Sequence, residues 1–191
     1  MRWIIINPEG VSHSNPVAAP RESGKHKYTN ALKGQFIPVL MAQSLTKLYV
    51  HIIFHIKANS PIIRNSEKQS LYAYMGAVIK DNESIPIIIN GVEDHVHILC
   101  VQSKKIALAK LVEEIKRHSS RWVKTLNPHY KKFAWQGGYG GFSVSQSLHD
   151  KTKQYILNQE DHHKKMTFKY ELLAFFKEYN VDYDEKYLWN D

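Results

Sequence analysis

The densest hydrophobic stretch of the chain covers residues 45–57, LTKLYVHIIFHIK, where most side chains are β-branched or aromatic. This composition predicts a long strand that is covered on both faces. A loop with Pro61 follows, and Ser66-Glu67-Lys68-Gln69 then has the form of a capping box at the start of a helix. Apolar residues at helical spacing predict this helix over about residues 65–80: Leu71, Met75, Val78 and Ile79.

A hairpin and a second helix are predicted next. Residues 85–89 are apolar, Asn90-Gly91 is a strong signal for a two-residue turn, and residues 92–101 form the second arm. Residues 105–126 then show one apolar stripe at helical spacing, with a basic opposite side.

Residues 133–145 combine two glycine pairs with four aromatic side chains. Two compatible interpretations stay open. The segment is a bulged strand whose aromatic rings fill the core, or its rings are exposed and stack on unpaired bases while the glycines permit hinge motion.

Two further helices are predicted, one over about residues 147–165 and one over about residues 168–179, before an irregular tail. The resulting order is strand, helix, strand, strand, helix, strand, helix. This order predicts an α+β, ferredoxin-like fold, in which helices cover one face of an antiparallel sheet, with additional C-terminal helices. Such sheets often bind single-stranded nucleic acid.

The first 40 residues differ in character from the rest of the chain. Prolines fall among serines and glycines, without a sustained period of 2 or 3.6. A new methionine, Met41, then opens the hydrophobic pattern. We therefore expect residues 1–40 to be a disordered or extraneous N-terminal extension and residues 41–191 to be one functional domain.

The charge distribution indicates a polyanionic partner. The formal net charge is +8 and the isoelectric point is near 9.4. Residues 104–132 contain nine basic side chains against only Glu113 and Glu114. A one-sided concentration of this kind favours contact with a phosphate backbone over an ordinary solvated helix face. The side chains expected to contact DNA, with two aromatic rings for stacking, are Lys104, Lys105, Lys116, Arg117, Arg121, Lys124, Trp135 and Tyr139.

Cysteine content and hydrophobic run lengths indicate the compartment. The single cysteine, Cys100, excludes an internal disulfide and fits a reducing cytoplasm. Its place at the end of an apolar run favours a packing role over a nucleophilic one. Because no run approaches the roughly 20 apolar residues that span a bilayer, we expect a soluble, cytoplasmic protein that associates with the nucleoid.

The candidate chemistry centres on Glu93-Asp94-His95-Val96-His97. In a strand, His95 and His97 share one face about 7 Å apart, where two imidazoles can converge on one metal ion. A polar strand face with two ordinary histidines is the alternative. Tyr155 and Gln159 lie four residues apart on one side of a predicted helix and favour a shared site.

Several other polar residues are candidates for supporting roles. His51 and His55 are expected to serve packing or hydrogen bonding rather than metal binding. His162 and His163 are expected to cap or pack the late helix. Asp94 points away from the histidines by strand alternation, which leaves it as a structural or outer-sphere candidate, and no residue stands out as general base.

Four stretches in this order carry a resemblance to a known family: MAQSLTKLYVHIIFHIK, GVEDHVHIL, WQGGYGGFSVS, and YILNQEDHH with the later Phe168 and YLW. Residues 41–191 resemble the HUH-type, single-tyrosine transposases of the insertion-sequence-200-like family, including their domesticated relatives that are associated with repeated palindromes. The first 40 residues have no counterpart in this resemblance.

The resemblance implies a metal-dependent endonuclease and strand transferase that acts on single-stranded DNA hairpins at element ends. By motif match, His95, His97 and Gln159 are the metal ligands and Tyr155 is the nucleophile that forms a 5′-phosphotyrosine. Two imidazoles and a carboxamide without a thiolate suit Mg²⁺ or Mn²⁺. The family's proteins are homodimers. In many, the tyrosine helix completes the partner's site, and the glycine pairs at 137–138 and 140–141 sit where such a helix would swing.

Two alternatives remain beside the transposase. One is a relaxase or rolling-circle replication nuclease with the same histidines. The other is a domesticated, non-catalytic module that binds palindromic DNA or RNA.

Overall fold

The core of the computed structural model, which describes residues 44–184, is an antiparallel sheet with the strand order β2-β3-β1-β4. The strands are β1 (Leu48–His55), β2 (Ile85–Gly91), β3 (His95–Gln102) and β4 (Gly140–Val144). Helix α1 (Asn65–Asp81) connects β1 to β2, and helix α2 (Leu108–Leu126) with the short 3₁₀ helix η1 (Pro128–Lys132) connects β3 to β4. This order and topology confirm the predicted ferredoxin-like α+β fold.

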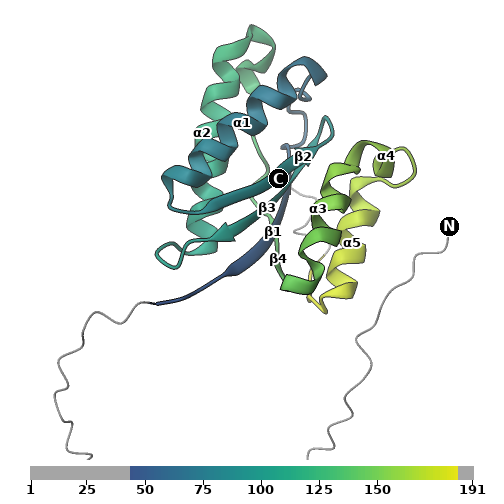
Figure 1. Cartoon of the computed structure of the whole chain (residues 1–191). Helices are drawn as coiled ribbons and strands as arrows, with labels where there is room; N and C mark the ends of the chain where they lie inside the picture. Colours follow the sequence, from purple (N-terminus) through teal and green to yellow (C-terminus); the bar gives the residue numbers. More distant parts are fainter. Residues whose placement is uncertain (1–43, 185–191) are drawn as a thin grey trace, which may run out of the picture. The chain divides into compact units, whose positions relative to one another are not determined.

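Both faces of the sheet are covered by helices (Figure 1). Helices α1 and α2 pack on one face, where Val50, Ile52 and Phe54 of β1 enter the main core. The C-terminal segment covers the other face with η2 (Gln146–Leu148), α3 (His149–Leu157), α4 (Gln159–His163) and α5 (Phe168–Glu178). Strand β1 is therefore buried on both sides, as its uninterrupted hydrophobic pattern predicts.

The hairpin that carries the histidines has a different turn from the predicted one. Asn90 and Gly91 lie inside β2, paired with His97 and Val96, and residues 92–94 make the connection. The main-chain N–H of Val92 donates to the carbonyl of His95 at 3.2 Å and closes this turn. Gly91 is required for space rather than for a turn, since a Cβ atom there would lie 2.2 Å from the His95 carbonyl oxygen.

The start of α1 also differs from the prediction. The helix begins at Asn65, which places Ser66 inside the first turn, and its N-cap residue Arg64 makes no side-chain capping bond. Glu67 instead accepts a hydrogen bond from the Tyr130 hydroxyl. The capping-box prediction is therefore wrong, although the predicted helix at residues 65–80 is confirmed.

The predicted single helix over residues 147–165 is broken at Asn158 into α3 and α4. The glycine pairs do not connect this region to the sheet. Gly140 and Gly141 pair with Ile53 and Ile52 inside the sheet, and residues 145–148 form the connection from β4 to α3. The expected hinge at the glycines is therefore not where the tyrosine helix leaves the sheet.

Some expectations fall on residues outside the described range. These are the extension at residues 1–40, the start at Met41, and most of the tail with its YLW sequence at residues 187–189. Within residues 44–184, none of the helices combines the length and the apolar character needed to cross a membrane.

Candidate metal and nucleophile site

His95 and His97 lie on the face of the sheet that the C-terminal helices cover. Strand alternation directs Val96 into the main core and both imidazoles to the opposite side, as predicted. Both histidines are completely buried. Their Nε2 atoms have no hydrogen-bond partner among residues 44–184. Because a buried polar atom without a partner is costly, these two nitrogens require an explanation.

The other ring nitrogen of each histidine has a partner that fixes the ring. Nδ1 of His95 lies 2.6 Å from Oδ1 of Asp94, and Nδ1 of His97 lies 3.0 Å from Nε2 of His51. A carboxylate only accepts hydrogen bonds, so Nδ1 of His95 carries the proton and Nε2 of the neutral ring presents its lone pair. Asp94 precedes β3, so strand alternation does not turn it away. His51 has the hydrogen-bonding role that was expected.

Glu171 of α5 lies at the centre of the site and was not singled out from the sequence. Its Oε1 atom accepts hydrogen bonds from the Tyr155 hydroxyl and, at 3.1 Å, from Nε2 of Gln159. Its Oε2 atom lies 3.4 Å from Nε2 of His97 and 3.6 Å from Nε2 of His95. One buried carboxylate therefore joins the histidine face of the sheet to the helices that carry the tyrosine and the glutamine.

His163 of α4 approaches the same oxygen. Its Nε2 atom lies 3.0 Å from Oε2 of Glu171, and its ring centroid lies 4.3 Å from that of His95. The expectation that His163 only caps or packs the late helix is thus too narrow. Neighbouring His162 is half-buried, and its Nε2 atom lies 3.4 Å from the Tyr155 hydroxyl oxygen.

Burial and mutual contact set the charge of these groups. Burial lowers the pKa of His97 from 6.5 to about 4, although the negative charge of Glu171 opposes this shift. Burial alone would raise the pKa of Glu171, but its contacts with His163, His97 and Tyr155 hold the pKa well below its usual range. Burial and the charge of Glu171 raise the pKa of Tyr155. The site is therefore a carboxylate facing neutral imidazoles and a protonated phenol.

The donor atoms are arranged as a cation would require. One atom each from His95, His97, His163 and Glu171 lies within 4.8 Å of the other three. Oε1 of Gln159 is buried and, like the two Nε2 atoms, has no hydrogen-bond partner in the described part of the chain. Imidazole nitrogens, a carboxylate and an amide oxygen are donors suited to a divalent ion such as Mn²⁺. The residues present therefore fit a bound divalent cation.

Comparison with known proteins places this geometry in a family. Residues 44–159 match the profile of the family described as "Transposase IS200 like", which covers β1 to the first residue of α4. The chain belongs to the IS200-like transposase family. No curated protein matches it.

Two solved structures are similar to this transposase. One is a candidate transposase from Deinococcus radiodurans, with 21% identity, a TM-score of 0.49, and coverage of 61% of this chain and 94% of that one. The other is a REP-associated tyrosine transposase bound to a REP hairpin, with 12% identity, a TM-score of 0.45, and coverage of 64% and 71%.

The sequence of this transposase contains one signal for Glu171 that composition alone hides. Phe168, Leu172 and Phe175 form the apolar stripe of α5, and Glu171 lies within that stripe. An acidic residue on the buried face of an amphipathic helix requires a partner, which marks it as a candidate for a buried site. His163 offers no such signal, because α4 is short and its neighbour His162 is equally polar.

Most residues predicted to contact DNA lie on the other side of the sheet from the histidines. Helix α2 covers the face that is opposite to α3 and α5, and Arg117, Arg121 and Lys124 are exposed on it. Lys104 and Lys105 are exposed just before this helix. Lys116 is half-buried and donates to the carbonyls of Gln136 and Gly138.

The two predicted stacking residues differ in position. Trp135 is buried, with its ring against Phe54 and Phe133 and its indole N–H donating to Ser119 at 2.9 Å. It therefore has no free face for a base, and its assignment to DNA stacking does not fit the structure. Tyr139 is 39% exposed and remains available. Of the two interpretations of residues 133–145, the core role describes Trp135 and leaves the stacking role open for Tyr139.

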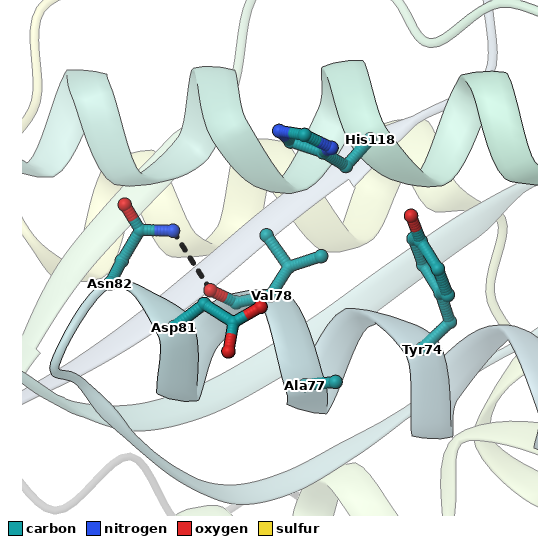
Figure 2. A pocket seen from close by; sticks show the side chains of 6 residues that line it. All are labelled: Tyr74, Ala77, Val78, Asp81, Asn82 and His118. Carbon is teal, nitrogen blue, oxygen red and sulfur yellow. Dashed lines mark hydrogen bonds between the residues drawn. The ribbon is translucent and has the colours of Figure 1, made fainter.

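A separate pocket of about 130 Å³ lies between α1 and α2, away from the histidines (Figure 2). It is lined by Tyr74, Ala77, Val78, Asp81, Asn82 and His118. The Asn82 side chain donates to the Val78 carbonyl at 2.8 Å and is used to cap α1. This pocket thus brings together no set of groups comparable to the cluster around Glu171.

Proposed function

We propose that this transposase cleaves and rejoins single-stranded DNA at hairpin-bearing element ends, with Tyr155 as nucleophile and a divalent cation as cofactor. The observation that supports this most strongly is the meeting of two strand histidines and the Tyr155 hydroxyl around one buried carboxylate. The family match covers His95, His97, Tyr155 and Gln159, which are the residues that the sequence motifs assign to the reaction.

The cation would be held by Nε2 of His95, Nε2 of His97 and Oε1 of Gln159, the three buried atoms without hydrogen-bond partners among the described residues. When bound, Mg²⁺ or Mn²⁺ neutralises charge on a non-bridging phosphate oxygen and orients the phosphate for in-line attack. Asp94 and His51 hold the two imidazoles with their lone pairs directed into the cluster.

Tyr155 attacks the scissile phosphate through its phenol oxygen. The O–P bond to tyrosine forms as the bond from phosphorus to the 3′ oxygen breaks, which gives a 5′-phosphotyrosine and a 3′ oxygen that takes a proton from solvent. Oε1 of Glu171 accepts the phenol hydrogen bond and is placed to take the phenol proton. The reverse attack by another 3′-hydroxyl restores the phosphodiester without ATP, because the phosphotyrosine retains the bond energy.

DNA binding is proposed for the exposed basic side chains on and before α2, namely Lys104, Lys105, Arg117, Arg121 and Lys124, with Tyr139 as a stacking residue. A DNA hairpin as partner is supported by the second solved neighbour, which is bound to a REP hairpin. A homodimer and a place at the nucleoid remain proposals from the resemblance. In the single chain, α3 lies on the chain's own sheet, so Tyr155 reaches the histidines without a second copy.

Tyr155→Phe tests the nucleophile directly. A single-stranded hairpin oligonucleotide labelled at its 3′ end is incubated with Mn²⁺ and protein, and covalent adducts are resolved on denaturing gels. We expect the wild type and the matched control Tyr170→Phe, which alters an exposed tyrosine of α5, to form adducts. Tyr155→Phe is expected to form none while still binding the hairpin. Adducts in Tyr155→Phe would contradict the proposal, and hairpin binding without cleavage by the wild type would indicate a binding module.

A further inference from the structure

Glu171 and His163 lie beyond residue 159, where the family match ends, yet they complete the cluster of donor atoms. We infer that Glu171 of α5 and His163 of α4 are ligands of the same divalent cation as His95 and His97, so that the cation locks the C-terminal helices onto the sheet. This inference rests on the proposed function, because it concerns the cation site of that reaction.

The distances among the donor atoms carry the first step. Oε2 of Glu171 lies 3.0 Å from Nε2 of His163, 3.4 Å from Nε2 of His97 and 3.6 Å from Nε2 of His95. Ligand atoms bound about 2.1 Å from one ion and at right angles to each other are about 3 Å apart. The carboxylate oxygen therefore already lies at the separation from each nitrogen that joint coordination requires.

The hydrogen-bond directions carry the second step. His95 gives its Nδ1 proton to Asp94, so its Nε2 lone pair faces the Glu171 carboxylate. Two lone pairs facing each other in a buried site repel, and a cation between them removes this repulsion. The Nε2 atoms of His95 and His97 are fully buried and have no hydrogen-bond partner among residues 44–184, although Glu171 is close to both.

The two oxygens of Glu171 divide their contacts. Oε2 faces the imidazoles, whereas Oε1 accepts hydrogen bonds from the Tyr155 hydroxyl and from Gln159. A cation held on the Oε2 side is thus connected through one carboxylate to the nucleophile's oxygen. Glu171 is a cation ligand and also a positioning residue for Tyr155.

The elements that contribute these ligands explain the lock. His95 and His97 come from β3, whereas Glu171 and His163 come from α5 and α4, on the layer that covers the sheet. Apart from this cluster, α5 is held by apolar contacts such as Phe175 against His51 and Phe168 against His95. A cation shared between the layers therefore adds directional bonds where packing alone operates.

Mn²⁺ titration of the metal-stripped full-length chain, followed by isothermal calorimetry, tests the ligand set. We expect Glu171→Gln, which keeps the shape of the side chain, to weaken Mn²⁺ binding at least about tenfold. The matched control Glu178→Gln removes an exposed carboxylate from the same helix and should leave the affinity unchanged. His97→Ala, which tests the proposed site itself, should abolish binding.

The two hypotheses fail in different ways in this experiment. If His97→Ala abolishes Mn²⁺ binding while Glu171→Gln binds as tightly as the wild type, the lock is overturned and the proposed function stands. If His97→Ala also binds normally, or the wild type binds no Mn²⁺, both are overturned. A gain in affinity for Glu171→Gln likewise overturns the lock, since the carboxylate would then block the site.

Pulsed electron paramagnetic resonance of bound Mn²⁺ keeps the inference testable if Glu171→Gln does not fold. The wild-type spectrum should contain couplings to three imidazole nitrogens, and His163→Gln should reduce these to two. Two couplings in both proteins would overturn the assignment of His163. Hydrogen exchange adds the conformational readout: Mn²⁺ should increase protection of α5 amides in the wild type and in Glu178→Gln, and equal protection with and without Mn²⁺ would overturn the lock.

Discussion

Nε2 of His51 lies 3.0 Å from Nδ1 of His97, on the opposite side of the His97 ring from the Glu171 carboxylate. His51 is itself buried, and burial together with the neighbouring His97 lowers its pKa well below the ordinary value. A neutral His51 accepts the Nδ1 proton of His97 and so leaves Nε2 of His97 with its lone pair toward the cluster.

His51→Leu tests this relationship. Loss of the acceptor frees the His97 ring to rotate and to change tautomer, and we expect Mn²⁺ affinity to fall about 10-fold to 100-fold while the fold is retained. Calorimetric titration measures the change. His129→Leu, which alters an exposed histidine of η1, serves as the control. An unchanged affinity in His51→Leu would show that packing alone orients His97.

Asn90→Ala is expected to loosen the tyrosine helix. The Asn90 side chain in β2 donates to the Ile156 carbonyl at 2.8 Å and to the Leu157 carbonyl at 3.0 Å, at the end of α3. Loss of both bonds should lower the free energy of unfolding by about 1–2 kcal/mol and reduce hydrogen-exchange protection in α3.

The control for this prediction is Asn82→Ala, which removes a similar side-chain bond from the end of α1. It should reduce the free energy of unfolding without changing the exchange of α3. Equal loss of α3 protection in both variants would contradict a specific role for Asn90.

Gly91→Ala should disrupt the histidine strand. The new Cβ atom would lie 2.2 Å from the His95 carbonyl oxygen and 2.9 Å from Val96 Cα, so β3 must shift at the first metal-binding candidate. We expect a loss of roughly 3 kcal/mol or more in the free energy of unfolding, together with loss of Mn²⁺ binding. At Gly138, where a Cβ atom meets no heavy atom within 4 Å, substitution by alanine should change stability by less than about 1 kcal/mol. Urea denaturation compares the two variants.

The metal-free protein should lose stability as the pH falls from about 6.5 to about 4. His97 has a pKa of about 4 in the folded protein against 6.5 ordinarily, so the unfolded chain binds its proton first. The stability from this residue is fully present above pH 6.5 and decreases by up to about 3 kcal/mol at the acidic end. His163 opposes this trend, because contact with Glu171 outweighs its burial and raises its pKa.

Urea denaturation in EDTA between pH 7 and pH 4.5 measures this dependence. His97→Leu should flatten the pH profile, whereas the exposed control His129→Ala should preserve it. A wild-type free energy of unfolding that stays constant over this range would contradict the burial of a neutral imidazole.

The fold was predictable from the sequence because its strands and helices have strong local patterns. The continuous apolar run around β1 indicated burial on both faces, and the spacing of Leu71, Met75 and Val78 indicated α1. The Asn90-Gly91 turn was misplaced because the requirement for glycine at position 91 comes from a neighbouring strand rather than from local backbone conformation. Sequence patterns carry little information about such close approaches.

The candidate site was predictable only where its residues lie close together in a motif. His95 and His97 share a strand face by alternation, and Tyr155 and Gln159 were placed by resemblance. Glu171 joins them from a helix more than 70 residues after the histidines, and only tertiary packing brings it there. Asn158 also breaks the helix between Tyr155 and Gln159, yet both side chains still reach Glu171, because the packing of α5 selects their directions.

The sheet separates the basic surface of α2 from the cluster around Glu171. A nucleic acid that engages both must wrap around a border of the sheet, so the minimal substrate needs a folded stem and an unpaired arm long enough to make that passage. Recognition of the stem and the chemistry on the arm are then separable traits. Substitutions on α2 can retarget the enzyme to a new palindrome while its reactive centre stays unaltered.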